Sequence, residues 1–511
     1  MTGTVDVFAK PPQSYWLTST ASPGYPALEK DIKVDAAVVG GGLVGVTAAY
    51  LLKQENLTVA LIEAGRIGQG TTGHTTAKIT SQHSLIYSKL IEQVGLEKAR
   101  QYAEANEFAI TFIENLVKNK MIDCDFSQQA AYVYTREDQY IKRIEEEVKA
   151  AAGLGIKAFY QEQTALPFAV RAAERFDNQA QFHPRKYLLA LAKDIPGGGS
   201  HIFEQTRAVD FPGGRPFVIT TGSGHTVTAD NVIIASHFPA YGGSGYYFAR
   251  IYPERAYALA VEAKEQFPGG IYVAAEPAGA SLRSAPHDGG ELIIVVGGRH
   301  RTGQGPPTED HYRNLVQLAG QTFNVTGIPF RWSAQDYTTL DEIPYVGPLS
   351  NRDTHVYVAT GFRKWGITNG TAAALLLKDL IIHGESPWAA VYDPARFMAD
   401  PMIKSAVSPG ADIAAPKSGA PPEIPEAAAL APGESMVATV EGKRVGLYRD
   451  DRGRLHAVYI TCTHMGCELV WNGAELSWDC PCHGSRFTCE GEIMEGPALK
   501  PLHTGGDRYN P

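Results

Sequence analysis

A glycine-rich stretch near the amino terminus constrains the fold more than any other part of the chain. It reads as an apolar strand from Val34, a turn with Gly40, Gly42 and Gly45 in G-x-G-x-x-G register, an Ala- and Leu-rich helix, and a second strand ending at Glu63. Such glycines allow a tight turn, close approach to a pyrophosphate and close helix packing, while the terminal acid bonds ribose hydroxyls. The stretch predicts an adenine-dinucleotide site in an α/β domain. The alternative is a glycine-rich turn without a ligand.

The tract after Glu63 is too polar for a core strand and too rich in glycine for a regular helix. Its position predicts that the rest of a cofactor lies against its backbone amides and hydroxyls, and a solvated loop is the alternative. The candidate residues of the tract are Gly70, Thr71, Thr72, His74, Thr75 and Thr76.

Composition limits the other possibilities. With 511 residues, 44% of them hydrophobic, the chain is long enough for two or three domains. The net charge of −9 is spread without a long basic run, so we expect no binding to nucleic acid or to an anionic membrane surface. No targeting segment or spanning apolar stretch is recognisable, and we expect a cytoplasmic protein.

The middle of the chain alternates helical and strand-like patterns. Residues 1–33 predict an arm over the surface, and residues 84–120, 138–152 and 186–193 predict helices. Residues 255–300 carry short strand-like runs separated by Pro and Gly, which indicates an antiparallel sheet. We expect this sheet to belong to a substrate domain inserted into the nucleotide fold, formed by residues of about 85–200 and 250–335.

A second glycine turn precedes a late helix. The strand 355–359 runs into Gly361 and then into Gly366, Ile367 and Thr368, followed by a helix up to Ile382. A helix N-terminus at this place could polarise an electron-rich ring such as a reduced flavin.

The chain changes character after residue 407. Residues 408–433 contain 6 Pro and 8 Ala and predict a semi-rigid linker, and the short strands beyond it predict a small all-β module over residues 434–511. Five of the six cysteines lie in this module. Two loops, Cys462-x-His464 and Cys480-x₂-His483, offer two thiolates and two imidazoles, as a Rieske [2Fe–2S] centre requires, and structural zinc is the alternative.

The module closely resembles the Rieske family. The resemblance implies that Cys462 and Cys480 hold one iron, that His464 and His483 hold the other, and that a disulfide joins Cys467 to Cys482. It also implies that Ser485 donates to a cluster sulfur, while Phe487 replaces a tyrosine of high-potential relatives and predicts an intermediate potential. We expect Cys124 and Cys489 to be buried thiols.

The polar tract and the late glycine helix favour FAD over NAD. With the inserted sheet, residues 34–385 resemble the D-amino-acid oxidase and glycine oxidase superfamily, and the whole chain (flavin domain 34–407) resembles bacterial fusions of such a domain to a Rieske domain. The resemblance assigns cofactor contacts to the residues above and places Val209 at the adenine. The ADP half takes Gly40, Gly42, Gly45 and Glu63; the flavin side takes Gly70, Thr71, Thr72, His74, Thr75 and Thr76; the pyrimidine side takes Gly361, Gly366, Ile367 and Thr368.

Three residues are catalytic candidates. His74 occupies the place where dimethylglycine-oxidising relatives bond covalently to the flavin, and a noncovalent contact is the alternative. Lys364 could stabilise the reduced ring or form only a surface ion pair. Arg283 could clamp a substrate carboxylate, as could Arg299, His300 and Arg301 on the same sheet, and a solvated strand end is the alternative for each arginine.

The expected reaction is oxidation of a small amine or amino acid by hydride transfer to FAD. The electrons would then pass singly through the cluster to an external carrier. The alternatives are an electron-transfer or redox-sensing protein, a reductase running electrons from cluster to flavin, and a Rieske oxygenase. The oxygenase needs a mononuclear iron on two histidines and a carboxylate, and no such spacing stands in the sequence.

Overall fold

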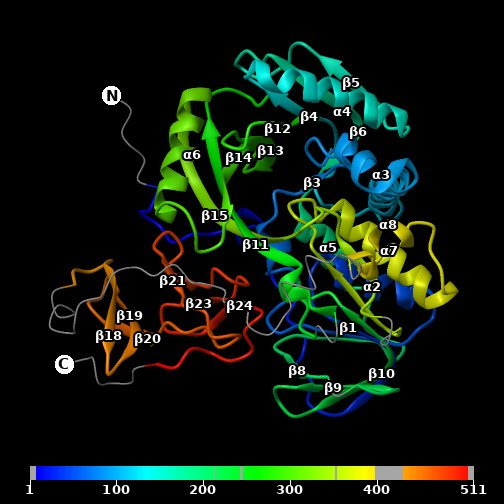
Figure 1. Cartoon of the computed structure of the whole chain (residues 1–511), viewed down its shortest axis with the longest axis vertical. Coiled ribbons are helices and arrows are strands. Elements are labelled where there is room, and N and C mark those ends of the chain that lie inside the picture. Colours follow the sequence, from blue (N-terminus) through cyan, green and yellow to red (C-terminus); the bar gives the residue numbers. More distant parts are fainter. Residues whose placement is uncertain (1–6, 212, 242–244, 351–353, 398–429, 505–511) are drawn as a thin grey trace.

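The computed structural model describes residues 7–211, 213–241, 245–350, 354–397 and 430–504. Two large sheets and a small all-β module make up the molecule (Figure 1). Within the described residues, no helix combines the length and the apolar character that a membrane crossing requires. The expected architecture of an α/β domain, an inserted sheet and a small all-β module is confirmed.

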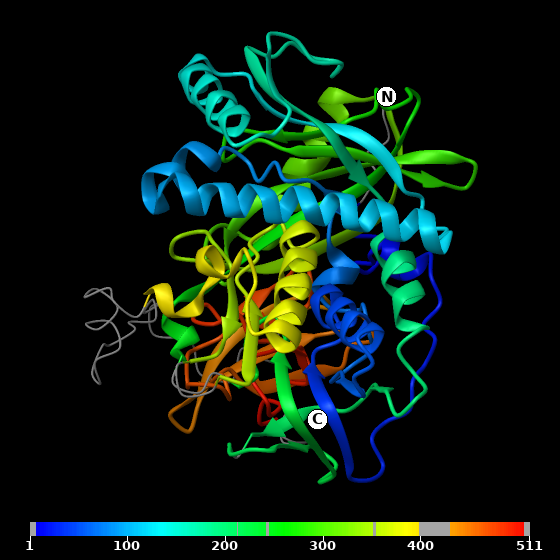
Figure 2. The same ribbon diagram turned by 90° about the vertical axis from the view of Figure 1, so that its right-hand side faces the viewer.

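The first sheet contains the amino-terminal strand at its centre. β1 pairs in parallel with β2 and β10, and its residues alternate between two cores, so that Ala36 and Val38 face one and Ala37 and Val39 the other. The helices α2 and α7 cover one face side by side (Figure 2). The strands are β1 (Ile32–Val39), β2 (Val59–Ile62), β7 (His201–Phe203), β8 (Ala208–Asp210), β9 (Phe217–Thr221), β10 (Thr226–Ile234), β16 (Tyr345–Pro348) and β17 (Val356–Thr360).

The second sheet has nine strands and is antiparallel except at one place. β12 pairs in parallel with β4, which departs from the purely antiparallel sheet expected from the sequence. Both strands enter the sheet from separate parts of the chain, so no hairpin forces them to run in opposite directions. The strands are β3 (Lys78–Ile79), β4 (Ser127–Thr135), β5 (Ala158–Gln161), β6 (Ala172–Gln181), β11 (Ile251–Ala263), β12 (Ile271–Ala274), β13 (Ser281–His287), β14 (Gly290–Arg301) and β15 (Val325–Thr339).

Helices join and cover the two sheets. The longest, α3, lies across the boundary between them (Figure 2), and its backbone leaves helical geometry at Gly95, where φ is 82°. The α-helices are α1 (Tyr15–Thr18), α2 (Leu43–Gln54), α3 (Tyr87–Lys120), α4 (Ile141–Gly153), α5 (Pro184–Ala192), α6 (Thr308–Thr322), α7 (Thr368–His383) and α8 (Ala389–Tyr392). The short 3₁₀ turns are η1 (Thr71–His74), η2 (Asp138–Tyr140), η4 (Tyr247–Ala249) and η5 (Pro394–Phe397).

The carboxy-terminal module consists of two small antiparallel sheets beside the larger part (Figure 1). Its main core contains Trp478 and Phe487 together with the thiols Cys462 and Cys480. Most of the linker predicted at 408–433 lies outside the described residues. The strands are β18 (Ser435–Val440), β19 (Lys443–Arg449), β20 (Leu455–Tyr459), β21 (Val470–Asn472), β22 (Ser477–Asp479), β23 (Arg486–Thr488) and β24 (Ile493–Glu495).

The amino-terminal arm corrects one expectation. We predicted that it lies over the surface, but Tyr15 and Trp16 are 5% and 1% exposed and belong to the largest core. The indole of Trp16 donates a hydrogen bond to the carbonyl of Thr75 at 2.6 Å. The arm is therefore held against the polar tract. Its two large aromatic side chains are buried because removing their apolar surface from water is more favourable than leaving it exposed.

Candidate functional site

The first glycine turn has no room for side chains. A Cβ on Gly45 would lie 1.8 Å from the carbonyl oxygen of Gly40, and one on Gly40 would lie 2.5 Å from that of Ala235. Gly40 also has a φ of 113°, which favours glycine. Gly42 is the N-cap of α2 and has no side chain of its own to cap the helix. Backbone N–H groups at a helix N-terminus bind phosphates in other proteins, and a phosphate contact at this turn stays a prediction.

Glu63 lies in the nucleotide half of the predicted site. Its carboxylate accepts hydrogen bonds at 2.7 Å from the backbone N–H groups of Gly41 and Gly65. Burial raises the pKa of the Glu63 carboxyl, although the two N–H donors act in the opposite direction. The acid thus lies directly beside the glycine turn, as a ribose-binding residue would. Val209 lies on β8 at 37% exposure, and its contact with adenine stays a prediction.

The polar tract is built into the fold and is not a solvated loop. The hydroxyl of Thr72 accepts a hydrogen bond from the backbone N–H of Leu43 at 3.0 Å, which fixes the tract at the start of α2. His74 Nδ1 lies 2.9 Å from the carbonyl oxygen of Gly70. This contact occupies one ring nitrogen, so a covalent bond to a flavin would have to use the other, and the attachment stays a prediction.

The second glycine turn leads into α7. A Cβ on Gly361 would lie 2.4 Å from the Thr339 methyl group, and its φ is 79°. The hydroxyl of Thr368 donates to the carbonyl of Thr80 at 2.8 Å, so the start of α7 is held against the strand that follows the polar tract. Gly366 and Ile367 precede this helix as expected. Their contact with a pyrimidine ring stays a prediction.

Two of the catalytic candidates, Arg283 and Lys364, already have partners within the protein. Arg283 is 2% exposed, and its Nη1 donates to the carbonyls of Thr76 and Ala77 at 3.0 and 2.7 Å. Its Nε donates to the carbonyl of Ser284 at 3.0 Å, so a substrate contact would have to use Nη2. Lys364 Nζ lies 3.2 Å from a carboxylate oxygen of Asp336 in a partly buried ion pair. Both side chains thus have structural partners, and their catalytic roles stay predictions.

The other arginines of the inserted sheet also have partners. Arg299 donates two hydrogen bonds to Glu254 at 2.9 and 2.8 Å, and the guanidinium of Arg301 lies 4.2 Å from the ring centre of Tyr252. These contacts favour structural roles over a substrate clamp.

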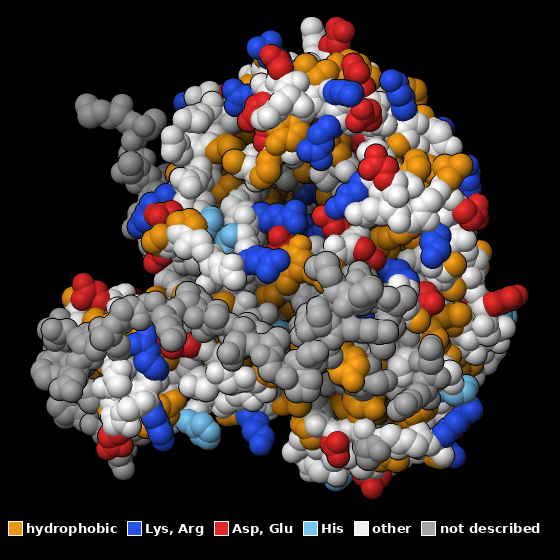
Figure 3. Space-filling view, viewed as in Figure 1, with side chains coloured by type: hydrophobic (Ala, Val, Ile, Leu, Met, Phe, Trp, Pro, Cys, Tyr) orange, Lys and Arg blue, Asp and Glu red, His pale blue; other side chains and the backbone are white. Residues whose placement is uncertain are grey.

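The sequence did not single out Lys78 on β3. Its Nζ donates to the hydroxyl of Thr76 at 2.8 Å. Burial, followed by the charges of Arg283 and Lys364, lowers the pKa of Lys78 to about 7. The charges of Arg283 and Lys364 therefore act on Lys78 beside the polar tract. Figure 3 shows a hollow with Lys and Arg side chains in it on the face that it draws. A lysine between apolar neighbours at the end of a polar run gives no distinct sequence signal.

The carboxy-terminal module gathers a metal-binding donor set. The imidazoles of His464 and His483 lie 5.0 Å apart by ring centres, and the Nδ1 atoms of both are buried without a hydrogen-bond partner in the described structure. The Cys462 and Cys480 thiols are buried and lie within hydrogen-bonding range of each other. Two thiols and two orphaned imidazole nitrogens fit a Rieske [2Fe–2S] cluster, although the individual ligand roles remain our prediction.

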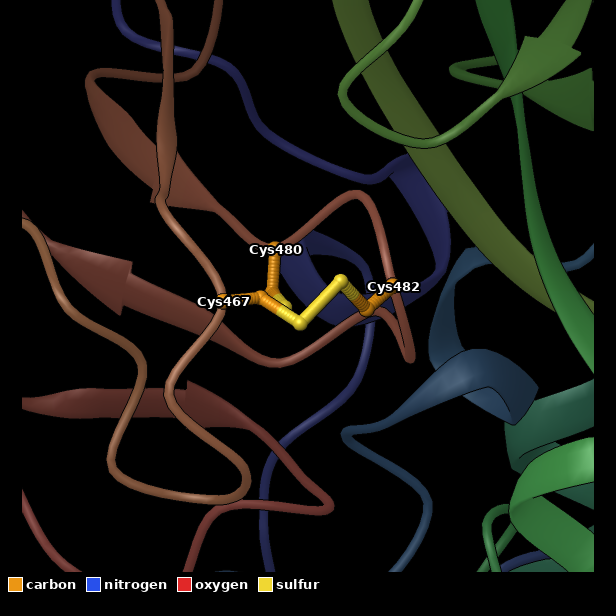
Figure 4. Close-up of side chains that lie close together, drawn as sticks. All are labelled: Cys467, Cys480 and Cys482. Atoms are coloured by element: carbon orange, nitrogen blue, oxygen red, sulfur yellow. A yellow bond between two sulfur atoms is a disulfide. The ribbon is translucent and has the colours of Figure 1, made fainter. Parts of the chain in front are cut away.

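A disulfide clamps the two cluster loops. Cys467 and Cys482 are bonded, with their Cα atoms 6.6 Å apart, and the Cys480 sulfur lies close to the bridge (Figure 4). Cys124 is buried as expected, whereas Cys489 is partly exposed. This corrects our expectation of a buried thiol, since Cys489 directly follows the last residue of β23 and stands outside the core of the module.

Family comparisons agree with both sites. The family described as FAD dependent oxidoreductase matches residues 35–380, and the Rieske [2Fe-2S] domain matches residues 421–505. The chain therefore belongs to the FAD-dependent oxidoreductase family and carries a Rieske domain on its carboxy-terminal side.

Two relatives and one solved structure are similar to this chain. The chain is 43% identical over 498 residues, 97% of this chain and 98% of the relative, to the "Putative Rieske 2Fe-2S iron-sulfur protein YhfW" of Bacillus subtilis. Gamma-glutamylputrescine oxidoreductase of Escherichia coli is 25% identical over 387 residues, which cover 70% of this chain and 85% of the relative. The glycine oxidase structure from Geobacillus kaustophilus shares the fold, with a TM-score of 0.61, 20% identity, and coverage of 71% of this chain and 99% of that one.

The chain is thus a flavin-dependent oxidoreductase with an iron–sulfur electron-transfer module, and its cofactors are FAD and a [2Fe–2S] cluster. The glycine turn, Glu63 and the start of α7 would hold the FAD, which supplies two-electron oxidation chemistry when bound. The chain itself supplies binding, orientation and charge around it.

Proposed function

We propose that this protein is a dehydrogenase that oxidises a small amine or amino acid at its flavin and passes the electrons through the Rieske cluster to an external carrier. The observation that carries the proposal is the presence of both redox sites in one chain. A cluster that moves single electrons has a use beside a two-electron flavin when the final acceptor is a one-electron carrier.

The names of two similar proteins and the local charge support the proposed substrate class. Relatives are named for gamma-glutamylputrescine and for glycine, both of which carry an amine next to a C–H bond. Lys78 lies beside the polar tract, and because its pKa is lowered to about 7 it can take up a proton near neutral pH and pair with a substrate carboxylate. We propose that the site orients the C–H bond toward the flavin and excludes water, because orientation and water exclusion supply much of the rate gain in such reactions.

Anaerobic mixing with a panel of N-methyl amines and amino acids tests this proposal. We expect at least one compound to bleach the visible flavin absorbance in a saturable way. Bleaching by none of the panel would contradict the proposal and favour an electron carrier without a substrate of its own.

A further inference from the structure

One strand, β15, lies between the two redox sites. Successive side chains of a strand point to opposite faces. On one face, the Trp332 indole donates to the carbonyl of His74 at 2.9 Å, and Asp336 pairs with Lys364. This face of β15 therefore forms a wall of the flavin site.

The opposite face of β15 holds the cluster loop. The side-chain amide of Gln335 donates to the carbonyl of Gly484 at 2.7 Å, and the hydroxyl of Tyr337 donates to the carbonyl of His483 at 2.8 Å. Gln335 and Tyr337 are 2% and 1% exposed. A Cβ on Gly484 would lie 2.7 Å from the Gln335 amide nitrogen, so the loop and the strand are in close contact.

Gln335 also contacts the flavin side through its backbone. The hydroxyl of Thr71, in the polar tract, donates to the carbonyl of Gln335 at 3.2 Å. Its side chain then reaches Gly484, which is peptide-bonded to the predicted iron ligand His483. One residue thus connects the two sites by two hydrogen bonds and its own covalent bonds.

Both predicted histidine ligands pack against the flavin domain. His483 is 3% exposed, and its ring lies 6.3 and 6.2 Å from the ring centres of Phe238 and Phe248. The ring of His464 lies 5.9 Å from that of Phe238, and His464 also lines a groove of about 390 Å³ together with Phe238, Phe248 and Lys500. The cluster is therefore enclosed on the side of β15, while His464 borders the groove.

Further contacts fix the module in this position. The Tyr312 hydroxyl donates to Glu475 at 2.7 Å, and the backbone N–H of Ala474 donates to the hydroxyl of Thr308 at 3.1 Å. These contacts lie beyond the cluster loops, so the module is held at more than one place.

We infer that the cluster is reduced where it is docked, and that Gln335 is the bridging residue whose two hydrogen bonds connect the flavin site to the cluster loop. This inference rests on the proposed function. With both groups bound, each transfer would move one electron from reduced flavin to the cluster and would convert one ferric ion to ferrous. Two transfers and the release of two protons would return the flavin to its oxidised form, and an external one-electron carrier would remove each electron from the cluster.

The test uses the holoenzyme without substrate. A light flash with a photoreductant reduces the flavin anaerobically, and the visible absorbance of the cluster reports its reduction. We expect a fast phase in the wild type that added sucrose does not slow, because no domain has to move. Gln335→Leu should lose that fast phase. Gln129→Leu is a matched change at a glutamine whose side chain bonds the Gly270 N–H and the Ser127 hydroxyl, and it should retain the fast phase.

A second pair of variants tests the hydrogen bond between Thr71 and the carbonyl of Gln335. Thr71→Val, which loses the hydroxyl, should also lose the fast phase, whereas Thr71→Ser should keep it at equal FAD content. Hydrogen–deuterium exchange of the peptide 480–486 should remain as in the wild type for Gln335→Leu.

Three results would overturn the inference. They are a normal fast phase in Gln335→Leu, a wild-type rate that falls with viscosity, and a lost fast phase accompanied by faster exchange of the cluster loop, which would show that Gln335 only holds the module. The proposed function fails separately, if no amine or amino acid bleaches the flavin while flash-induced transfer persists.

Discussion

Gly45 has the least space of the residues in the nucleotide turn. Because an added Cβ would lie 1.8 Å from the carbonyl oxygen of Gly40, Gly45→Ala should push α2 away from β1 and disrupt the phosphate site. We expect the variant to purify with little FAD, measured by its visible absorbance per polypeptide. The control Gly153→Ala lies at the end of α4, where nothing stands within 4 Å, and should retain full FAD. Full FAD content in Gly45→Ala would contradict the assignment of this turn.

Because His183 is buried, we expect the stability of the folded protein to depend on pH. Its Nδ1 accepts from the backbone N–H of Lys186 at the start of α5, and its Nε2 lies 3.0 Å from the hydroxyl of Ser19, an arrangement that suits the neutral ring. Burial lowers the pKa of His183 to about 4 from an ordinary value of 6.5. The unfolded chain therefore binds a proton between these values while the native chain does not, so stability is full above 6.5 and falls as the pH drops toward 4.

The expected loss for this one group is about 2 kcal/mol of unfolding free energy between about pH 8 and about pH 5. His183→Asn keeps a cap acceptor without the titration. Denaturant unfolding at both pH values should show a smaller decrease in the variant than in the wild type. Equal decreases would show that His183 does not titrate as described.

At the residue scale, the site residues that could be predicted from the sequence are those that stand at characteristic spacings. The glycine triplet, Glu63 and the two Cys-plus-His loops stand at intervals that backbone geometry and metal coordination require. Lys78 was missed because its importance comes from charges that only the fold brings near it.

At the element scale, β15 shows why a strand can escape detection. Strand prediction relies on alternation between polar and apolar residues. β15 carries Arg331, Gln335 and Asp336 among its aromatic residues, because both of its faces contact polar sites. Because β15 lies between the flavin site and the cluster loop, it lacks the alternation of polar and apolar residues by which a strand is recognised in a sequence.

The amino-terminal arm gives a prediction of its own. Trp16 is 1% exposed, its ring lies 4.8 Å from that of His183, and Arg283 lies 5.5 Å from its ring centre. Trp16→Ala should destabilise the flavin domain by about 3–5 kcal/mol, as expected for removal of a buried Trp. Denaturant unfolding followed by flavin fluorescence measures this loss. Phe108→Ala, at a site that is 49% exposed, should cost much less. Similar losses would show that the arm is not part of the core.

At the scale of the whole molecule, the order of the domains was predictable and their docking was not. A linker and a change in composition mark a boundary in sequence, but hydrogen bonds between Tyr312 and Glu475 or between Gln335 and Gly484 join residues far apart in the chain. No local pattern encodes such contacts without information from relatives.

Arg331 connects the arm, the flavin domain and the Rieske module. It donates hydrogen bonds to the carbonyls of Val7, Lys10 and Ala474, at 2.8, 3.1 and 3.0 Å. Hydrogen bonds from charged donors contribute roughly 1.5–3 kcal/mol each. Arg331→Met should therefore speed hydrogen exchange in peptides covering 7–13 and 470–476.

The control for this experiment is Arg171→Met, whose side chain is 62% exposed and pairs with Asp138. Exposed pairs contribute little, so exchange in the same peptides should not change. Unchanged exchange in Arg331→Met would show that the docking does not depend on this residue.

The account as a whole depends on one relay within a single molecule. It is tested most directly by mixing the anaerobic holoenzyme with an amine that bleaches the flavin while recording the absorbance of flavin and cluster together. We predict that the cluster becomes reduced after the flavin, at a rate that does not change with protein concentration. A cluster that stays oxidised beside a fully reduced flavin, or a rate that rises with protein concentration, would contradict the account.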